Sequence, residues 1–552
     1  MPRTVFGILI AVAATCLGIS HSRAQTDARF IPPPMSVPTA RFYQAHQDAY
    51  ARLLARLPQP GSSSLLRRQV VPASAGAWTA VTKGPPGLCN PLLMHDATVI
   101  AHVCDSKNWV KLTPDANGNY ATGTWTQIAS FPVIGGTQYA PQYNASSVLP
   151  DGRVIVMGGE YNNGKAVWTN LGAIYNPVAN SWTAVTAPAG WTQIGDAEST
   201  VLANGTYLLA SCCSYPDADA LLNASTLTWT TTGAPAGGAY QDEQGYELLP
   251  TGNVLTVDVW SATTNPTSAE LYNASSGVWG ATGSTPVSLV DSCGTYEIGP
   301  AVLRANGTVV GFGGNTGCNN VTADPTAVYS SSTGVWTSGP NVPSICGSDG
   351  ATGCDLADAP AAFLPNGNVL FAASAGYGGM PTHFFEYSAA NAITQVSDPL
   401  DNSTTSGAYY YNFLVLPTGQ VLMTDFSNTA ELFTPSGKTI ASNAPVVTKG
   451  PTKLVPGTTY SFSGTQLNGV TQGAYYGDDA QADTNYPIVK ITNTATGHVF
   501  YAPTSNYSTM SVAPGTAGSA SFTVPAGTET GASTLTVIAS GAASKALSVT
   551  VK

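Results

Sequence analysis

The stretch SSVLPDGRVIVMGG, residues 146–159, holds two apolar runs on either side of Asp151 and Gly152. Asp-Gly between apolar runs favours a β-hairpin, because glycine accepts the positive φ that a tight turn needs. The same pattern recurs along the chain, with turn glycines at Gly152, Gly205, Gly252, Gly307, Gly367 and Gly419. A degenerate copy, PLLMHDATVIAHVC, precedes them at residues 91–104. The chain is therefore expected to be all-β and to contain seven repeats.

Each repeat continues past its hairpin with a second pair of strands. In four repeats a tryptophan follows seven positions after an apolar or aromatic residue: Tyr175 and Trp182, Leu222 and Trp229, Tyr272 and Trp279, and Tyr329 and Trp336. Four strands over roughly 40 to 60 residues is the size of a propeller blade, so we expect a seven-bladed β-propeller. The last repeat lacks this tryptophan. AWTAVT (77–82) nearly repeats SWTAVT (181–186), so the segment around Trp78 is expected to complete that blade.

The remaining segments suggest three further parts. Residues 1–24 are expected to be a signal peptide, with Arg3 before the apolar core VFGILIAVAATCLGI. Residues 25–76 are expected to form an N-terminal helical arm and linker, and residues 77–444 the propeller. Short strands with intervening turns over 445–552 predict an Ig-like β-sandwich. The mature protein is therefore expected to be secreted, periplasmic or on the cell surface.

Charge and hydropathy exclude two classes of partner. The net charge is −11 at pH 7, and nothing in this balance would neutralise phosphate groups, so no nucleic-acid partner is expected. No apolar run after the signal reaches about 18 residues, so no transmembrane span is expected in the mature chain.

The set Gly158, Gly159, Tyr175 and Trp182 resembles a Kelch repeat. A Kelch-like propeller followed by an Ig-like domain is similar to the galactose oxidase and glyoxal oxidase architecture. That resemblance implies a copper site of two Tyr, two His and a Cys cross-linked to one Tyr. By register from the turn glycines, these positions carry Tyr143 and Asp196, the pair Tyr409 and Tyr410, and the neighbourhood of Asn506 and Tyr507. They include no His and no Cys, so copper-radical oxidase chemistry is not expected.

Acidic and aromatic residues gather where the first strand of each repeat begins. In a propeller these positions face the funnel at the end opposite the turn glycines. The candidate ligand-binding residues there are Tyr143, Asp196, Asp242, Glu243, Glu297, Asp358, Tyr409 and Tyr410. The carboxylates could cap loop amides, could bind Ca²⁺, or could form a catalytic pair. No cofactor is expected, with Ca²⁺ as the ion that such a cluster would take.

The primary functional expectation is a non-catalytic binding protein, with a glycan or a cell-surface protein as ligand. Aromatic rings near the same rim favour a sugar. Two alternatives remain: an enzyme that acts on polysaccharide through the carboxylates of the funnel, and a diverged galactose-oxidase-like oxidoreductase. A turn or a contact with the propeller is expected for YYGDDAQAD (475–483).

Eight cysteines follow the signal peptide, an even number in an oxidising compartment. Their positions in the repeats predict three pairs, Cys89–Cys104, Cys293–Cys318 and Cys346–Cys354. The adjacent Cys212 and Cys213 would then form a vicinal disulfide. Two buried reduced thiols are the alternative for that last pair.

Overall fold

A computed structural model describes residues 76–214, 217–236, 240–261, 265–290, 296–314, 324–346, 353–376, 379–400, 403, 406–476 and 480–552. Throughout these residues the chain is all-β, apart from three short 3-10 turns, η1 (Val259–Ser261), η2 (Ala408–Tyr410) and η3 (Ala441–Asn443). The expected signal peptide, the helical arm and the pair Cys293–Cys318 lie outside the described residues.

Residues 77–434 form seven antiparallel units of four strands. From first to fourth strand they are β2 (Leu88–Leu93), β3 (Val99–Val103), β4 (Trp109–Thr113) and β5 (Thr124–Gln127); β9 (Ala145–Val148), β10 (Val154–Met157), β13 (Gly172–Asn176) and β14 (Ser181–Ala184); β15 (Ser199–Val201), β16 (Tyr207–Ala210), β17 (Asp219–Asn223) and β18 (Thr228–Thr232); β19 (Glu247–Leu248), β20 (Val254–Val257), β21 (Ala269–Asn273) and β22 (Val278–Ala281); β23 (Ala301–Leu303), β24 (Thr308–Phe312), β25 (Thr326–Ser330) and β26 (Val335–Ser338); β28 (Pro360–Phe363), β29 (Val369–Ala375), β30 (Thr382–Tyr387) and β31 (Ile393–Gln395); and β32 (Asn412–Val415), β33 (Val421–Thr424), β34 (Glu431–Thr434) and β1 (Ala77–Ala80).

The seven-residue spacing reflects cross-strand pairing. Tyr175 lies opposite Trp182 across β13 and β14, and their ring centroids are 5.2 Å apart. The same registers hold in the fourth and fifth units. Such aromatic pairs stabilise a sheet through side-chain contact across neighbouring strands.

Strand β1 pairs with β34 and so belongs to the last unit, although it comes first in the chain. Trp78 lies opposite Phe433, at a centroid distance of 5.1 Å. This is the pairing that the near-repeat AWTAVT predicts. It ties the beginning of the repeat region to its end and leaves no unpaired edge on β34.

The C-terminal residues form two further sheets with a separate core around Phe462, Val489 and Leu535. One contains β35 (Val446–Lys449), β37 (Thr459–Thr465), β43 (Ala517–Thr523) and β42 (Thr504–Ser505); the other contains β36 (Lys453–Leu454), β46 (Leu547–Val551), β44 (Gly531–Ala539), β40 (Ile488–Asn493), β41 (Val499–Ala502) and β45 (Ala542–Ala543). They pack on the end of the repeat region that carries the turn glycines, where Met510 N–H donates to Ala203 O at 2.9 Å.

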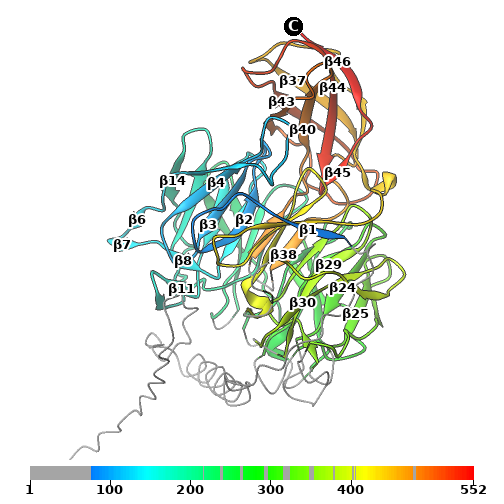
Figure 1. Ribbon diagram of the computed structural model, residues 1–552. Helices are drawn as coiled ribbons and strands as arrows, with labels where there is room; N and C mark the ends of the chain where they lie inside the picture. The colour runs from blue at the N-terminus through cyan, green and yellow to red at the C-terminus, as the bar shows by residue number, and fades with distance from the viewer. Residues whose placement is uncertain are drawn as a thin grey trace, which may run out of the picture.

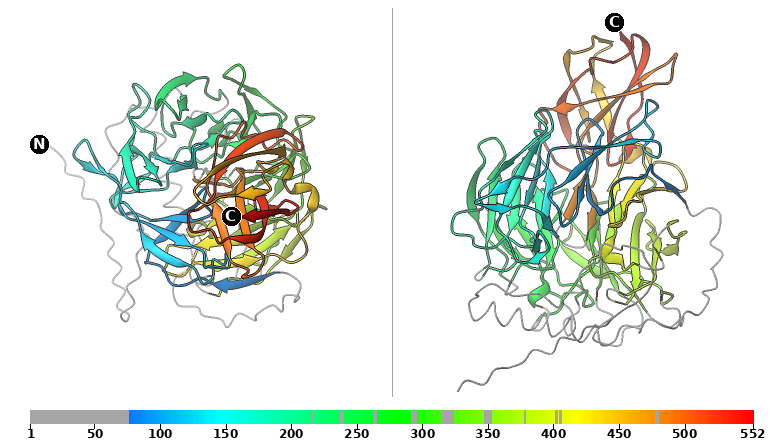
Figure 2. Two further views of the ribbon diagram at one scale, coloured as in Figure 1. Left: turned by 90° about the horizontal axis from the view of Figure 1, so that it is seen from above. Right: turned by 60° about the vertical axis from the view of Figure 1, so that its left-hand side comes forward.

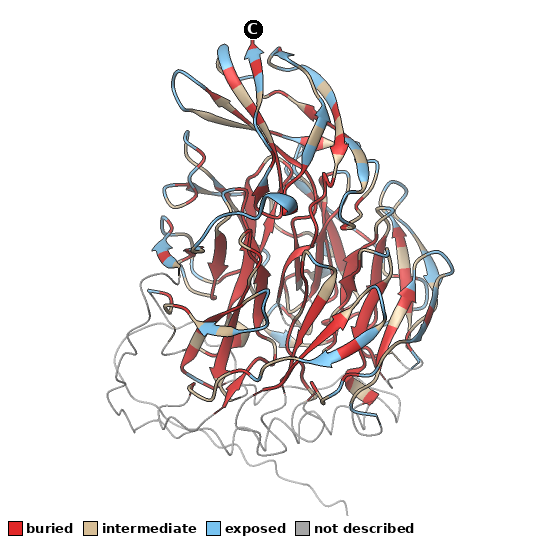
Figure 3. Cartoon of the chain, turned by 90° about the vertical axis from the view of Figure 1, so that its right-hand side faces the viewer, coloured by how far each residue is buried: buried red, intermediate tan, exposed pale blue. Residues whose placement is uncertain are grey.

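One C-terminal hairpin, β38 (Gly473–Tyr476) and β39 (Ala480–Asp483), lies at the centre of the seven units (Figures 1 and 2). Strand β38 pairs with β28, and β39 pairs with β9. The hairpin also contacts β2, β15, β23 and β32. The first strands of the units therefore surround it, and these inner strands are the buried ones (Figure 3).

Short strands connect these elements at the end opposite the turn glycines. They are β6 (Val133–Ile134), β7 (Thr137–Gln138), β8 (Pro141–Gln142), β11 (Tyr161–Asn162), β12 (Lys165–Ala166) and β27 (Cys354–Asp355). Among the described residues, no helix has the length and the apolar character needed to cross a bilayer.

Candidate functional site

We call the end of the seven units opposite the turn glycines the mouth. Tyr143, Glu243 and Asp358 lie there, each nine residues before the turn glycine of its unit. All three have positive φ, at 51°, 63° and 53°. Left-handed backbone is uncommon for residues other than glycine and often marks functional positions. The shared conformation shows that the repeat places these three residues in equivalent positions.

Three carboxylates meet at the mouth. Glu243, Glu297 and Asp358 come from three successive units, and each offers an oxygen atom within 4.8 Å of the others. Glu297 is buried, with 2% of its surface exposed. Like charges this close repel unless a proton or a cation lies between them. Carboxylate oxygens are the donors that hard divalent cations prefer.

A second group at the mouth combines sulfur and oxygen. Asp196, Cys212, Cys213 and Asp242 also have ligand atoms within 4.8 Å of one another, and all four are buried. Cys212 and Cys213 form a disulfide, and Cys213 Sγ lies 3.6 Å from Asp242 Oδ1. Because Asp242 precedes Glu243 directly, this sulfur group adjoins the carboxylate triad along the backbone.

Aromatic rings lie beside the triad on one side. The centroid of Tyr143 is 6.1 Å from that of Tyr161 and 6.4 Å from that of Phe426, and Tyr410 lies 5.6 Å from Phe426 and 4.3 Å from Tyr409. Burial raises the pKa of Tyr143 well above its usual value, and the nearby Tyr410, Glu160 and Asp358 add to the increase. The phenol is therefore protonated at neutral pH and can donate a hydrogen bond.

A second aromatic pair lies beside Glu297. Trp260 stacks on Tyr296 with centroids 4.3 Å apart and planes 11° apart, and Tyr240 meets Trp260 edge-on at 5.8 Å. Trp260 and Tyr296 are partly exposed. Tyr296 and Phe426 are not among the ligand-binding residues predicted from the sequence. Tyr296 could have been found, since it directly precedes a candidate carboxylate.

The structure thus gathers the eight predicted mouth residues into neighbouring groups. Glu243, Glu297 and Asp358 form the triad, whereas Asp196 and Asp242 lie with the sulfur atoms. Tyr143, Tyr409 and Tyr410 belong to the aromatic group.

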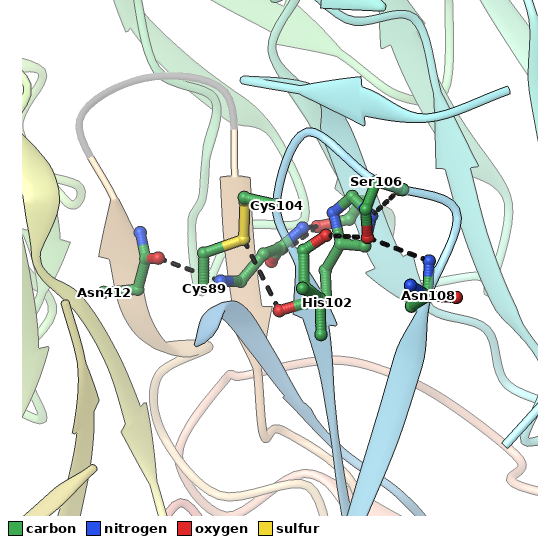
Figure 4. The surroundings of a disulfide bond; sticks show 9 residues. Cys89, His102, Cys104, Ser106, Asn108 and Asn412 are labelled. Atoms are coloured by element: carbon green, nitrogen blue, oxygen red, sulfur yellow. Dashed lines mark hydrogen bonds between the residues drawn. A yellow bond between two sulfur atoms is a disulfide. The ribbon is translucent and has the colours of Figure 1, made fainter. Parts of the chain in front are cut away.

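The described disulfides are Cys89–Cys104, Cys212–Cys213 and Cys346–Cys354, and they agree with the expected pairs. Figure 4 shows the first, which links the ends of the first hairpin. Beside it, the Nε2 atom of His102 lies 2.7 Å from Ser106 O, and Asn108 N–H donates to Ser106 Oγ at 3.0 Å. Burial lowers the pKa of His102 to about 4, so its imidazole is neutral at pH 7.

One register assignment is wrong. The resemblance to the oxidases predicts that residues 506 and 507 are the C-terminal segment nearest the mouth. Tyr507 OH instead lies 2.9 Å from His95 Nδ1, in the turn between β2 and β3, at the opposite end. The C-terminal segment that enters the ring is the hairpin of β38 and β39, and its residues Asp478 and Asp479 lie outside the described residues.

The centre of the ring holds buried acids. Tyr475 OH donates to Glu247 Oε1 at 2.9 Å, and Gln472 Nε2 donates to Asp483 Oδ1 at 3.2 Å. Burial raises the pKa of Asp483 to about 7 and that of Glu247 well above its usual value. The bond from Tyr475 holds the hairpin against β19, whereas the bond from Gln472 joins the two ends of the hairpin.

No protein-family model and no curated protein sequence matches the chain. Among solved structures, it is similar to one described as "Novel fungal alcohol oxidase with catalytic diversity among the AA5 family, in complex with copper". The match covers 87% of this chain and 100% of that chain, with 12% identity and a TM-score of 0.48. We draw no inference about activity from a likeness of this size.

The expectation that no cofactor is needed is wrong. The described residues assemble three groups whose ligand atoms could hold a metal ion, and two of them lie at the mouth. The sequence did not reveal the two mouth groups, because each of them joins residues of different units and so has no short characteristic spacing.

The donor set of the triad does not fit copper. Copper(II) favours nitrogen ligands such as imidazole, whereas the triad offers carboxylate oxygens. The described histidines have other neighbours: His95 contacts Tyr507, His102 contacts Ser106, His383 contacts Asp398, and His498 contacts Glu529. Three carboxylates suit a hard cation instead.

Proposed function

We propose that this protein is an exported seven-bladed propeller with an Ig-like C-terminal domain, and that its mouth binds a hard divalent cation together with a polyhydroxylated ligand such as a carbohydrate. The observation that carries the proposal is the convergence of Glu243, Glu297 and Asp358 within 4.8 Å. Seven four-stranded units around a central hairpin support the propeller, and the two C-terminal sheets support the Ig-like domain.

The negative charge of the carboxylate triad favours a bound cation. Three carboxylates that are held together, one of them almost fully buried, would each lose solvation and repel the others. A divalent cation removes this penalty and keeps open positions for further oxygen ligands. Vicinal hydroxyl groups of a sugar would supply such oxygens.

The aromatic side chains beside the triad favour a carbohydrate as the ligand. The protonated phenol of Tyr143 can donate to a ligand oxygen, and the partly exposed rings of Trp260 and Tyr296 offer flat apolar surfaces. Pyranose rings combine hydroxyl edges with apolar faces, so they match both features. Aromatic side chains with one polar end are common where a ligand is half apolar and half polar.

A second candidate is oxidation of an alcohol at the same site when it holds Mn²⁺, a cation that also takes oxygen ligands and can change its oxidation state. It is favoured by the position of Tyr143, whose phenol is close enough to Asp358 and Tyr410 for their charges to raise its pKa. A phenol beside a redox-active metal can exchange an electron and a proton. The overall reaction would remove two electrons and two protons from the alcohol and pass them to molecular oxygen, which gives a carbonyl compound and hydrogen peroxide.

Metal binding is tested first, on the mature chain. After chelation and dialysis, Mn²⁺, Mg²⁺, Ca²⁺ and Cu²⁺ are titrated separately by calorimetry. We expect one hard cation per chain, and we expect Glu297→Gln to weaken its binding at least about 100-fold, since a charged ligand is lost. Asp151→Asn, in a turn at the far end, is the matched control and should bind normally. Equal binding by Glu297→Gln and the native protein would sink the proposal.

The ligand is tested next. A glycan array is probed with the cation present and after chelation, and bound sugars are retested with Tyr143→Phe. We expect binding that needs the cation and weakens several-fold in the variant. Hydrogen peroxide and carbonyl products, measured with the same sugars, distinguish oxidation from binding alone. Sugar binding that survives chelation would separate the ligand from the metal and contradict the joint site.

A further inference from the structure

We propose that the Cys212–Cys213 disulfide masks a second metal site, which a dithiol reductant opens. Its four ligands would be the two cysteine sulfurs with Asp196 and Asp242, and its ion a thiophilic divalent cation such as Zn²⁺. This site is separate from the carboxylate triad and does not rest on the proposed function.

The four ligands already lie together in the oxidised protein. Their donor atoms are within 4.8 Å of one another, and the exposed fractions of Asp196, Cys212, Cys213 and Asp242 are 7%, 0%, 1% and 2%. They come from three separate segments of the chain. Two sulfurs and two oxygens at such distances match the four-coordinate sites in which Zn²⁺ is bound.

Backbone contacts hold the cysteine pair independently of the sulfur–sulfur bond. Cys212 N–H donates to Ile194 O at 3.0 Å, and Gln241 N–H donates to Cys212 O at 3.0 Å. Ile194 lies two residues before Asp196, and Gln241 directly precedes Asp242. When the disulfide opens, these bonds therefore keep the backbone of Cys212 beside the segments that carry Asp196 and Asp242.

Gly195 leaves the space that the sulfur occupies. Its φ is 68°, and a Cβ atom there would lie 2.2 Å from Cys212 Sγ. A side chain at this position would clash with the sulfur and force Cys212 to move. Glycine at position 195 thus allows the sulfur of Cys212 to lie against the backbone next to Asp196.

The site forms in two steps, reduction of the disulfide and binding of the metal ion. In the first, a dithiol transfers two electrons and two protons to the Cys212–Cys213 bond, giving two thiols and the oxidised cyclic form of the reductant. In the second, Zn²⁺ displaces two protons and binds two thiolates and two carboxylates. Thiolates are the ligands that metals such as Zn²⁺ favour, whereas the triad of Glu243, Glu297 and Asp358 offers oxygen alone.

The experiment maps metal protection at each cysteine of the native, mature protein. The protein is treated with dithiothreitol without denaturant, desalted, and incubated with or without Zn²⁺. It is then alkylated and digested for mass spectrometry. We expect both Cys212 and Cys213 to become alkylated after reduction, and Zn²⁺ to slow that alkylation about tenfold or more. Cys346 and Cys354, which join no metal-ligand group among the described residues, are the internal control.

Site-resolved mapping also separates this site from Cys89 and Cys104, which lie near His102 and could respond to Zn²⁺ by themselves. Asp242→Asn should abolish the protection of Cys212 and Cys213 and leave their reduction intact. Glu297→Gln should leave the protection unchanged, because it alters only the triad.

Two results would overturn the inference. One is a Cys212–Cys213 bond that resists dithiothreitol in the folded protein. The other is protection by Zn²⁺ no greater than at Cys346 and Cys354. Both are measured on the native sequence, so neither depends on whether a variant folds.

Discussion

The two ends of the seven-unit ring are built from different kinds of contact. At the turn end, each hairpin is closed within its own unit: the side chains of Asp151, Asn204, Asn306 and Asn366 accept hydrogen bonds from the backbone N–H two residues later. At the mouth, the two groups join residues of different units, and their members are acids and sulfurs that are buried or half-buried. Each turn bond is local and can be lost without the others, whereas the mouth depends on how neighbouring units are placed and gathers acidic side chains.

The largest effect expected from this contrast concerns pH. Burial raises the pKa of Asp219 and Asp258, at the mouth end of the third and fourth units, to about 7. Burial and the neighbouring acids raise the pKa of Asp217 to about 8. The unfolded chain loses these protons near pH 4. Between pH 4 and these values the unfolded state binds fewer protons, so the free energy of unfolding falls as pH rises, by up to about 1.4 kcal/mol per pH unit for each group.

Two histidines act in the opposite direction over part of this range. Burial lowers the pKa of His95 and His102 to about 4, so their contribution to stability grows as pH rises from 4 to about 6.5. Above pH 6.5 the two histidines no longer titrate, so only the carboxyl groups change the free energy of unfolding, and they lower it. Urea unfolding should therefore show a loss of a few kcal/mol between about pH 5 and 8.

Variants separate the contribution of the mouth end from that of Glu247 and Asp483 at the centre, whose pKa values are also raised. Asp219→Asn should flatten the decline, because it removes one titrating group that accepts bonds from Gln241, Tyr246 and Trp279. Asp151→Asn, at the turn end, should leave the slope unchanged above pH 6.5, where His95, whose pKa the Asp151 carboxylate affects, no longer titrates. A free energy of unfolding that stays constant or rises between pH 6.5 and 8 would show that buried carboxyl groups at the mouth do not titrate as expected.

An intermediate effect is expected from a pair of glycine substitutions. Gly195→Ala, at the mouth, should cost roughly 2–5 kcal/mol, because the new Cβ meets Cys212 Sγ and the backbone has a positive φ. Gly252→Ala, in a turn, has a similar φ of 82° but nothing closer than 3.9 Å, so it should cost only about 1–2 kcal/mol. Urea midpoints measure both, and equal losses would remove the difference between the two ends.

The smallest effect is expected within the turns. Asn204→Ala removes the acceptor for Thr206 N–H, an exposed bond of 3.0 Å, and should cost about 0.5–1 kcal/mol. Asn306→Ala, in the equivalent turn, should cost the same amount. A thermal shift that differs strongly between the two would show that the turns are not interchangeable.

Much of the fold could be predicted because its signals are local. The turn glycines have the positive φ that the hairpins require, and the Tyr–Trp spacing corresponds to cross-strand pairs. The same register placed Tyr143, Glu243 and Asp358 in equivalent positions at the mouth. Register failed for the C-terminal part, because which of its loops enters the ring depends on how that part docks.

The sequence by itself determined the all-β hairpins, and it predicted the strand around Trp78 and the pairs Cys89–Cys104 and Cys346–Cys354, because each follows from spacing within a repeat or between similar repeats. Only the tertiary structure decided which acids meet, that Asp196 and Asp242 lie with sulfur, and that Glu243, Glu297 and Asp358 form a possible cation site. The physical reason is that these contacts cross from one unit to another, so their distances depend on how the seven units pack around the central hairpin.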